Sequence, residues 1–259
     1  MKPANQVVLL LFSFLLCLFS FQAFAENNHC KLTLGYDSWE PYQYLDVGNE
    51  VRGLDIDLML MVTKRMSCKV DFKQGAWIDL LALMKNGEID VLLGASKTER
   101  REQFALFSEP YRTEQFTLYV KKDDKQAHQL KTFSDFIANG KKLGVMDDYY
   151  YGDEVSQLQD SNENGQFVSA IIGEMNIARL LDDNIDAFIE DSIVGASMIR
   201  RKGLSTLIVP HNLSITSSDV YVMFSKKSVS PEIVKRFNLG LKGVKQSGEY
   251  DALLKMYKL

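Results

Sequence analysis

The feature that most limits the possible folds is an alternation of strand-like and helical segments in the first half of the chain. KLTLGY (31–36) has the pattern of a strand, and 53–67 has apolar residues at helical spacing. A short strand at 69–72 and a helix over Trp77–Asn86, ended by Gly87, come next. The continuous apolar run IDVLLG (89–94) is typical of a strand buried on both faces of a parallel sheet. This alternation predicts an α/β fold.

The same alternation restarts after Lys125. The predicted segments are helices over 133–139, 174–182 and 193–201 and strands over 142–146, 185–190 and 204–210. GEIDVLLG in the first half and DNIDAFIE in the second match loosely, which indicates two lobes of similar build. Two further strand-like segments, 115–122 and 219–227, would carry the chain between the halves and form a hinge beside a cleft. A Ser-Pro-Glu sequence at 230–232 predicts the start of a C-terminal helical region.

The first 25 residues have the layout of a secretory signal peptide. Lys2 gives a positive start, Val7 to Phe21 is almost wholly apolar, and Ala23-Phe24-Ala25 is a small-x-small cleavage site. An uncleaved membrane anchor is the alternative, but it needs about 20 apolar residues. The sequence therefore predicts cleavage after Ala25 and a mature protein outside the cytoplasm.

The overall charge excludes one class of partner. The formal net charge is −4 over 259 residues, and no basic stripe or nucleic-acid motif is present, so nucleic acid is not expected as a partner. The sequence has no zinc-ligand spacing, and we expect neither a metal nor a cofactor.

Two cysteines, Cys30 and Cys68, remain after removal of the signal peptide. In an oxidising compartment, an isolated pair is expected to form a disulfide, although two free thiols are the alternative. Each cysteine directly precedes a predicted strand, so parallel pairing of these strands would bring both to the same edge of a sheet.

A series of short motifs runs through the whole mature chain in a fixed order. They are W-E-P-Y (39–42), G-L-D-I-D-L (53–58), W-x-x-L-L (77–81), G-E-I-D (87–90), T-x-x-R (98–101), F-S-E-P-Y (107–111), I-D-A-F-I-E-D (185–191) and G-E-Y-D-A-L-L-K-M-Y (248–257). Together they resemble the bacterial extracellular solute-binding protein family 3, the polar-amino-acid-binding receptors of periplasmic ABC transport. The resemblance implies a type II periplasmic-binding-protein fold of two α/β lobes joined by a two-strand hinge. Lobe 1 would comprise 26–118 and 222–259, and lobe 2 would comprise 119–221.

The function implied by the resemblance is capture of a small zwitterionic or carboxylate ligand, an amino acid or a derivative, between two closing lobes. The protein would be a periplasmic monomer, would catalyse no reaction, and would deliver its ligand to an ABC permease in the membrane. Two alternatives remain: a cyclohexadienyl-type dehydratase of the same fold, with Glu190 or Asp148 as general acid, or a receptor that presents its ligand to a membrane sensor.

Arg101 is the central residue of the implied site. It aligns with the arginine that holds the ligand's carboxylate in the family, and its planar guanidinium suits that pairing. Ser96 and Gly94 would contribute where the strand ends, since ligands of α/β sheets bind beyond the carboxyl ends of strands. The neighbouring Arg100 is expected to be a solvated charge that pairs with Glu99 or Glu102.

Asp191 is the counterpart in the second lobe. The resemblance implies that it takes the ligand's ammonium group. The alternative is that Asp191 only caps the helix that starts at Ser192, because aspartate is a favoured N-cap residue.

Trp39 and Trp77 lie at family positions where an aromatic ring flanks the ligand, although either could instead be a core residue. Tyr36 is a further candidate ligand contact, placed where cationic-amino-acid binders carry an acid. The missing acid argues against lysine or arginine as the ligand.

The largest departure from the family follows the predicted strand at 142–146. Where many members have glycine followed by serine or threonine, this chain has Asp147-Asp148-Tyr149-Tyr150-Tyr151. The substitution predicts a more aromatic site, with Tyr149 and Tyr150 as candidate ligand contacts. The alternative is that the tyrosines pack within the lobe and only one of them faces the cleft.

Overall fold

The structure is a computed structural model that describes residues 30–161, 164–215 and 218–257. The predicted signal peptide (1–25) lies outside these residues. Within the described ranges, no helix has both the length and the apolar character needed to cross a membrane.

The first lobe is built on a mixed sheet. Its strands, in spatial order, are β4 (Lys69–Gln74), β1 (Lys31–Tyr36), β5 (Val91–Ala95), β13 (Ser218–Ser225) and β6 (Ala105–Phe107), and β7 (Arg112–Glu114) also pairs with β13. β1 is parallel to β4 and β5, whereas β13 is antiparallel to β5, β6 and β7. The parallel strands therefore end at the same edge of the sheet, and the site forms there.

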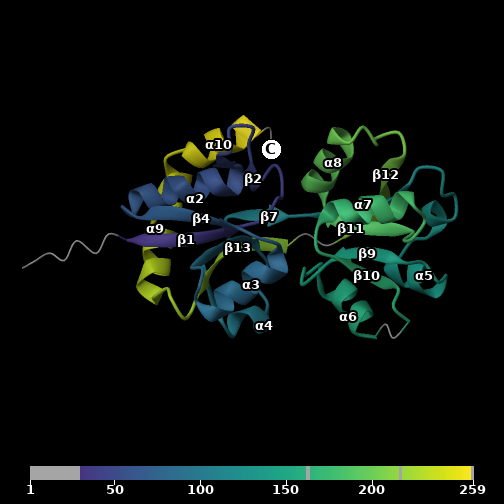
Figure 1. The fold of residues 1–259 in the computed structure, drawn as a ribbon, viewed down its shortest axis with the longest axis horizontal. Coiled ribbons are helices and arrows are strands. Elements are labelled where there is room, and N and C mark those ends of the chain that lie inside the picture. The colour runs from purple at the N-terminus through teal and green to yellow at the C-terminus, as the bar shows by residue number, and fades with distance from the viewer. Residues whose placement is uncertain (1–29, 162–163, 216–217, 258–259) are drawn as a thin grey trace, which may run out of the picture. The chain divides into compact units, whose positions relative to one another are not determined.

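Helices cover both faces of the first sheet (Figure 1). They are α2 (Leu54–Arg65), α3 (Trp77–Asn86), α4 (Glu99–Glu102), α9 (Pro231–Gln246) and α10 (Glu249–Tyr257). α3 begins at Trp77 and stops at Gly87, whose φ of 80° is the left-handed conformation that favours glycine. Its residues Leu80 and Met84 are fully buried in the core that α3 forms with the sheet. A short hairpin, β2 (Tyr44–Leu45) with β3 (Val51–Arg52), precedes α2.

The second lobe has its own mixed sheet. Its strands, in spatial order, are β10 (Phe167–Ala170), β9 (Leu143–Met146), β11 (Ala187–Asp191), β8 (Phe116–Lys121) and β12 (Ile208–Ser214). Its helices are a 3-10 turn (Ala127–Gln129), α5 (Phe133–Ala138), α6 (Asp153–Ser161), α7 (Gly173–Leu181) and α8 (Ser192–Arg201). α5 starts with a capping box in which Thr132 and Asp135 each accept a hydrogen bond from the other's backbone N–H.

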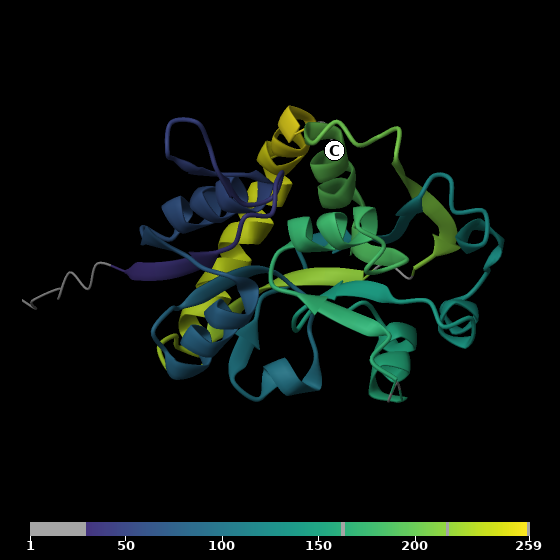
Figure 2. The ribbon, with the colours of Figure 1, turned by 45° about the vertical axis from the view of Figure 1, so that its right-hand side comes forward.

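The chain crosses between the two sheets twice. It passes from β7 to β8 through Gln115, and it returns from β12 to β13. After the return, α9 and α10 pack beside α2, so the yellow C-terminal helices lie with the blue N-terminal elements in both views (Figures 1 and 2). The predicted α/β architecture of two lobes joined by two crossings is confirmed.

The predicted disulfide is also confirmed, since both Cys30 and Cys68 are disulfide-bonded. The parallel register of β1 and β4 pairs Lys31 with Lys69, and these residues directly follow the two cysteines.

The sequence prediction differs from the structure in a few elements. It did not include α6 or β10, because α6 is a mostly polar helix and β10 is a short strand at the edge of its sheet. The strand predicted from 204 begins only at Ile208, since Leu204–Leu207 form a turn closed by a backbone hydrogen bond between those two residues.

Candidate functional site

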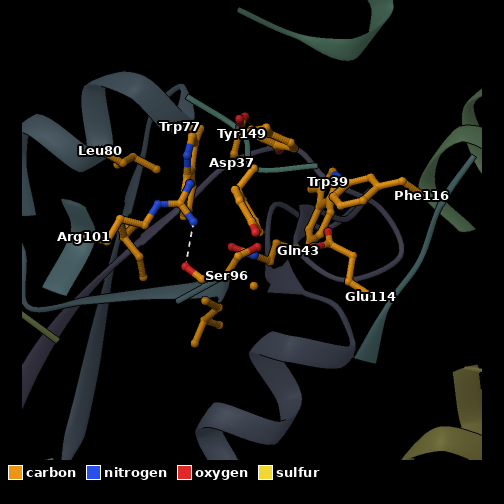
Figure 3. Close-up of a pocket in the computed structure, with 15 residues that line it drawn as sticks. Asp37, Trp39, Gln43, Trp77, Leu80, Ser96, Arg101, Glu114, Phe116 and Tyr149 are labelled. Atoms are coloured by element: carbon orange, nitrogen blue, oxygen red, sulfur yellow. Dashed lines mark hydrogen bonds between the residues drawn. The ribbon is translucent and has the colours of Figure 1, made fainter. Parts of the chain in front are cut away.

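A cavity lies beyond the carboxyl ends of β1 and β5, where residues of both lobes meet (Figure 3). This is where ligands of open α/β sheets bind. It is lined by Gly35, Asp37, Trp39, Gln43, Trp77, Leu80, Leu92, Leu93, Gly94, Ser96, Arg101, Glu114, Phe116, Tyr149 and Tyr150. Seven residues predicted from the sequence are in this set: Trp39, Trp77, Gly94, Ser96, Arg101, Tyr149 and Tyr150.

Arg101 projects into the cavity from α4 and is only 6% exposed. Thr98 caps this short helix by accepting a hydrogen bond from the Arg101 backbone N–H. One guanidinium nitrogen, Nη1, donates to the Ser96 carbonyl at 2.8 Å, and Nη2 donates to the Asp148 carbonyl of lobe 2 at 2.7 Å. Burial lowers the pKa of Arg101 to about 10, so the side chain stays positively charged at neutral pH.

Arg100 is exposed, as expected, but its predicted partners are wrong. Its guanidinium pairs with the Asp148 carboxylate of lobe 2, while Glu102 pairs with Lys97 at 2.9 Å. Asp148 has a φ of 61°, which turns its carboxylate to Arg100 and its carbonyl to Arg101. The two adjacent arginines therefore both contact one residue of the opposite lobe.

Two tryptophans form walls of the cavity (Figure 3). Trp39 packs over Gly94, where a Cβ would come within 2.9 Å of the indole ring, so only glycine fits at this position. Trp77 lies 5.3 Å from the Arg101 guanidinium, within cation–π range. Its indole Nε1 is buried, and no described residue accepts a hydrogen bond from it.

The three consecutive tyrosines, 149–151, lie in different surroundings. The Tyr149 ring meets Trp39 and Trp77 edge-on, with ring centroids 6.4 and 6.0 Å away, and it packs against the cores of both lobes. Tyr150 lines the cavity, and its hydroxyl donates to Asp153 at 2.6 Å. Tyr151 is buried in the lobe 2 core against Phe116, where its hydroxyl accepts the Met146 N–H.

The acid that cationic-amino-acid binders carry was predicted to be missing at Tyr36, but an acid is present at the next residue, Asp37. Tyr36 is buried against Phe72 and does not line the cavity, whereas Asp37 does. Burial raises the pKa of Asp37, although the backbone N–H groups of Ser38 and Trp77 oppose that rise. The expectation that this region carries no acid was therefore wrong, and the argument against lysine or arginine no longer holds.

Asp191 lies at the end of β11 but is not among the residues that line the cavity. It is 1% exposed, and its Oδ1 accepts the backbone N–H groups of Ile193 and Val194. Asp191 therefore caps helix α8, which was the alternative role considered for it. The adjacent Glu190 accepts a hydrogen bond from the Trp39 indole across the lobes at 3.4 Å, and burial raises its pKa to about 8.

A buried ion pair supports the wall of the cavity from behind. Arg112 donates to both carboxylate oxygens of Asp55, at 3.0 and 3.2 Å, and its guanidinium lies 3.8 Å from the Tyr42 ring centroid. Tyr111 donates to the same carboxylate at 2.6 Å and accepts the Gly94 N–H at 2.9 Å. This network fixes the backbone of Gly94 at the end of β5.

Besides one glycine and three leucines, sequence reasoning missed four lining residues: Asp37, Gln43, Glu114 and Phe116. Asp37 directly follows β1, so the strand-end rule that selected Ser96 would have found it. Glu114 ends the short polar strand β7, just before β8, which is a weaker signal. Gln43 and Phe116 carry no distinguishing pattern.

In the part of the chain that the structure describes, no group of three or more histidine, cysteine or acidic side chains is arranged to hold a metal ion.

Two α/β lobes with a charged, aromatic cavity at their junction define a receptor of the periplasmic-binding type. The family model of the bacterial extracellular solute-binding proteins, family 3, matches residues 32–259, and the chain belongs to that family. It is an extracellular binding protein, not an enzyme.

Known proteins resemble it over most of its length. A probable histidine-binding protein of Neisseria gonorrhoeae is 28% identical over 84% of this chain and 78% of its own. The arginine-binding periplasmic protein of Mannheimia haemolytica is 26% identical over 83% of this chain and 86% of its own. In fold, the chain is similar to the arginine-, lysine-, histidine-binding protein ArtJ from Geobacillus stearothermophilus, with a TM-score of 0.74, 24% identity, and coverage of 87% and 94%.

Proposed function

We propose that this protein captures a basic amino acid outside the cytoplasm for uptake by an ABC transporter. The names of its relatives support the ligand class, since they include histidine- and arginine-binding proteins. Residues 1–25 would act as the signal peptide, cleaved after Ala25, that delivers the protein to the periplasm.

The observation that carries the proposal is the presence of Arg101 and Asp37 in one cavity with two indole walls. Arg101 would hold the ligand's carboxylate, helped by Ser96, and Asp37 would face the cationic side chain. Trp39 and Trp77 would flank that side chain, since cations are attracted to the faces of aromatic rings. Gly94, Tyr149 and Tyr150 would complete the walls, and Asp191 would contribute negative charge from lobe 2.

Binding would proceed by closure of the lobes about the two crossings between the sheets. The moving bodies would be the predicted lobes, 26–118 with 222–259 and 119–221, with their boundaries shifted to the crossings at Gln115 and between β12 and β13. The Asp148 carbonyl now accepts one N–H of Arg101, so a ligand carboxylate that uses this N–H would have to replace it. Closure would exclude water from the cavity, and the remaining ion pairs would be stronger in the lower dielectric.

The test is a thermal-shift screen of residues 26–259 against amino acids, small organic acids and amines. Arginine, lysine or histidine should raise the melting temperature, because a ligand that binds only the native state stabilises it. Amines without a carboxylate and carboxylates without a cation should give little shift. Stabilisation by neutral or acidic amino acids alone would overturn the proposal.

A further inference from the structure

We propose that Glu114 is a ligand-contacting residue that accepts the α-ammonium group of the bound amino acid. This inference rests on the proposed function, and it assigns to the ammonium a contact that the sequence motifs do not indicate.

Glu114 is the last residue of β7, directly before the chain crosses to the second lobe. Its backbone pairs with Ser218 of β13, so its position is fixed at the hinge. The side chain is 3% exposed and lines the cavity, with its carboxylate directed toward Trp39 and Gln43 (Figure 3).

No described residue donates a hydrogen bond to this carboxylate or forms an ion pair with it. Buried polar groups are nearly always hydrogen-bonded, and a buried carboxylate without a donor is costly. A cation that enters the cavity would supply the missing donors.

The charged groups around Glu114 leave this role open. Arg112, on the same strand, is a cation that favours its ionisation, but its Nε and Nη2 are paired with Asp55 of α2, and its Nη1 has no hydrogen-bond partner among the described residues. Asp191 and Asp55 add negative charge, and Glu190, which burial keeps mostly protonated at neutral pH, adds no positive charge. Burial, followed by these acids, raises the pKa of Glu114 to about 8.

The charges that line the cavity match a basic amino acid one for one. The acidic and basic lining residues are Asp37, Arg101 and Glu114. The ligand's carboxylate, side-chain cation and ammonium would pair with Arg101, Asp37 and Glu114 respectively. Asp191 does not line the cavity, and its Oδ1 already accepts two N–H groups of α8.

This role makes binding proton-linked. Because the pKa of Glu114 is about 8 without ligand, the side chain is mostly protonated at pH 7. An adjacent ammonium favours the ionised form, so binding releases about one proton at pH 7. Affinity should rise as pH increases toward 8, and it should fall again at the higher pH where the ligand's own ammonium loses its proton.

The experiment is isothermal titration calorimetry of the mature protein with arginine at pH 7, in two buffers of different ionisation enthalpy. A second titration uses the arginine analogue that lacks the α-amino group. The variants are Glu114→Gln, Glu190→Gln to remove the other acid of similar pKa, and Glu109→Gln as an exposed control from the same segment.

We expect Glu114→Gln to bind arginine at least about tenfold more weakly. It should also lose the proton release, and it should no longer distinguish arginine from the deamino analogue. Glu190→Gln and Glu109→Gln should keep both the proton release and the discrimination. If Glu114→Gln discriminates as strongly as the wild type, or loses selectivity for the side-chain cation instead, the inference is overturned. If wild-type protein binds the basic amino acids no better than neutral ones, the proposed function itself fails.

Discussion

The two lobes contribute different kinds of group to the cavity. Lobe 1 supplies Arg101, Asp37, Ser96 and both tryptophans, and all of these except Trp39, which lies in the loop after β1, are held at the end of a strand or the start of a helix. Lobe 2 supplies Tyr149 and Tyr150 from the loop after β9, whereas its acids Glu190 and Asp191 already accept hydrogen bonds. The charge recognition is therefore built on lobe 1, and lobe 2 mainly closes over it.

The contacts across the cleft are also of different kinds. Arg101 donates to the Asp148 carbonyl, Arg100 pairs with the Asp148 carboxylate, and Trp39 donates to Glu190. The Arg101 contact involves a guanidinium that a ligand would use, while the contact between Arg100 and Asp148 lies on the surface. The difference indicates which substitutions should affect binding and which should affect only closure.

The largest effect is expected for Arg101→Ala. Loss of a buried, charge-assisted contact costs about 3 kcal/mol or more, so the affinity for arginine should fall at least about 100-fold. Titration calorimetry measures this loss, and the melting temperature without ligand checks that the fold persists. A dissociation constant within threefold of wild type would remove Arg101 from the site.

The next largest effect concerns the pH dependence of stability through Glu190. Its pKa in the folded protein is raised from 4.5 to about 8, so its stabilising contribution is present below pH 4.5 and is lost as pH rises through 8. Between pH 5.5 and 8.5 the contribution to the free energy of unfolding should decrease by roughly 3 kcal/mol. Urea unfolding of the ligand-free protein should show this decrease, and Glu190→Gln should reduce it. An unchanged pH dependence in Glu190→Gln would show that Glu190 is ionised in the native state.

A smaller and selective effect is expected for Asp37→Asn. The variant should bind arginine more weakly by about 2 kcal/mol, roughly 30-fold, because a buried cation loses its anionic partner. Binding of citrulline, which has the same shape but no side-chain charge, should change much less. The ratio of the two affinities is the readout, and equal losses for both ligands would mean that Asp37 does not face the side-chain cation.

The smallest effect is expected for Arg100→Ala. Its pair with Asp148 is exposed at the arginine end, and such pairs contribute about 0 to 1 kcal/mol. The affinity for arginine should change less than about fivefold. A loss as large as that of Arg101→Ala would contradict the division of roles between the two arginines.

The sequence predicted the two-lobed α/β architecture, and five of the residues that it singled out line the cavity from lobe 1: Trp39, Trp77, Gly94, Ser96 and Arg101. Strand and helix patterns predicted the sheets, and motif spacing selected Arg101 over the identical residue beside it. Asp37 was not predicted because the family position that carries an acid was assigned to Tyr36, one residue too early, although the residue that follows a strand ending at residue 36 lies at the site.

The lobe 2 side was less predictable for a physical reason. Tyr149, Tyr150 and Tyr151 are identical in type, and only the turn at Asp148, with its positive φ, decides that Tyr149 and Tyr150 line the cavity and Tyr151 enters the core. The role of Asp191 depended similarly on whether its carboxylate reached the helix N–H groups or the cavity. Such choices depend on local geometry that residue type does not determine.

The most direct test of the account is a crystal structure of residues 26–259 with arginine bound. It predicts that the ligand's carboxylate lies within hydrogen-bond distance of the Arg101 guanidinium, about 3 Å, and that the ligand's guanidinium faces Asp37 between Trp39 and Trp77. A ligand bound in the cavity with its carboxylate on lobe 2 and no contact to Arg101 would contradict the assignment of charge recognition to lobe 1.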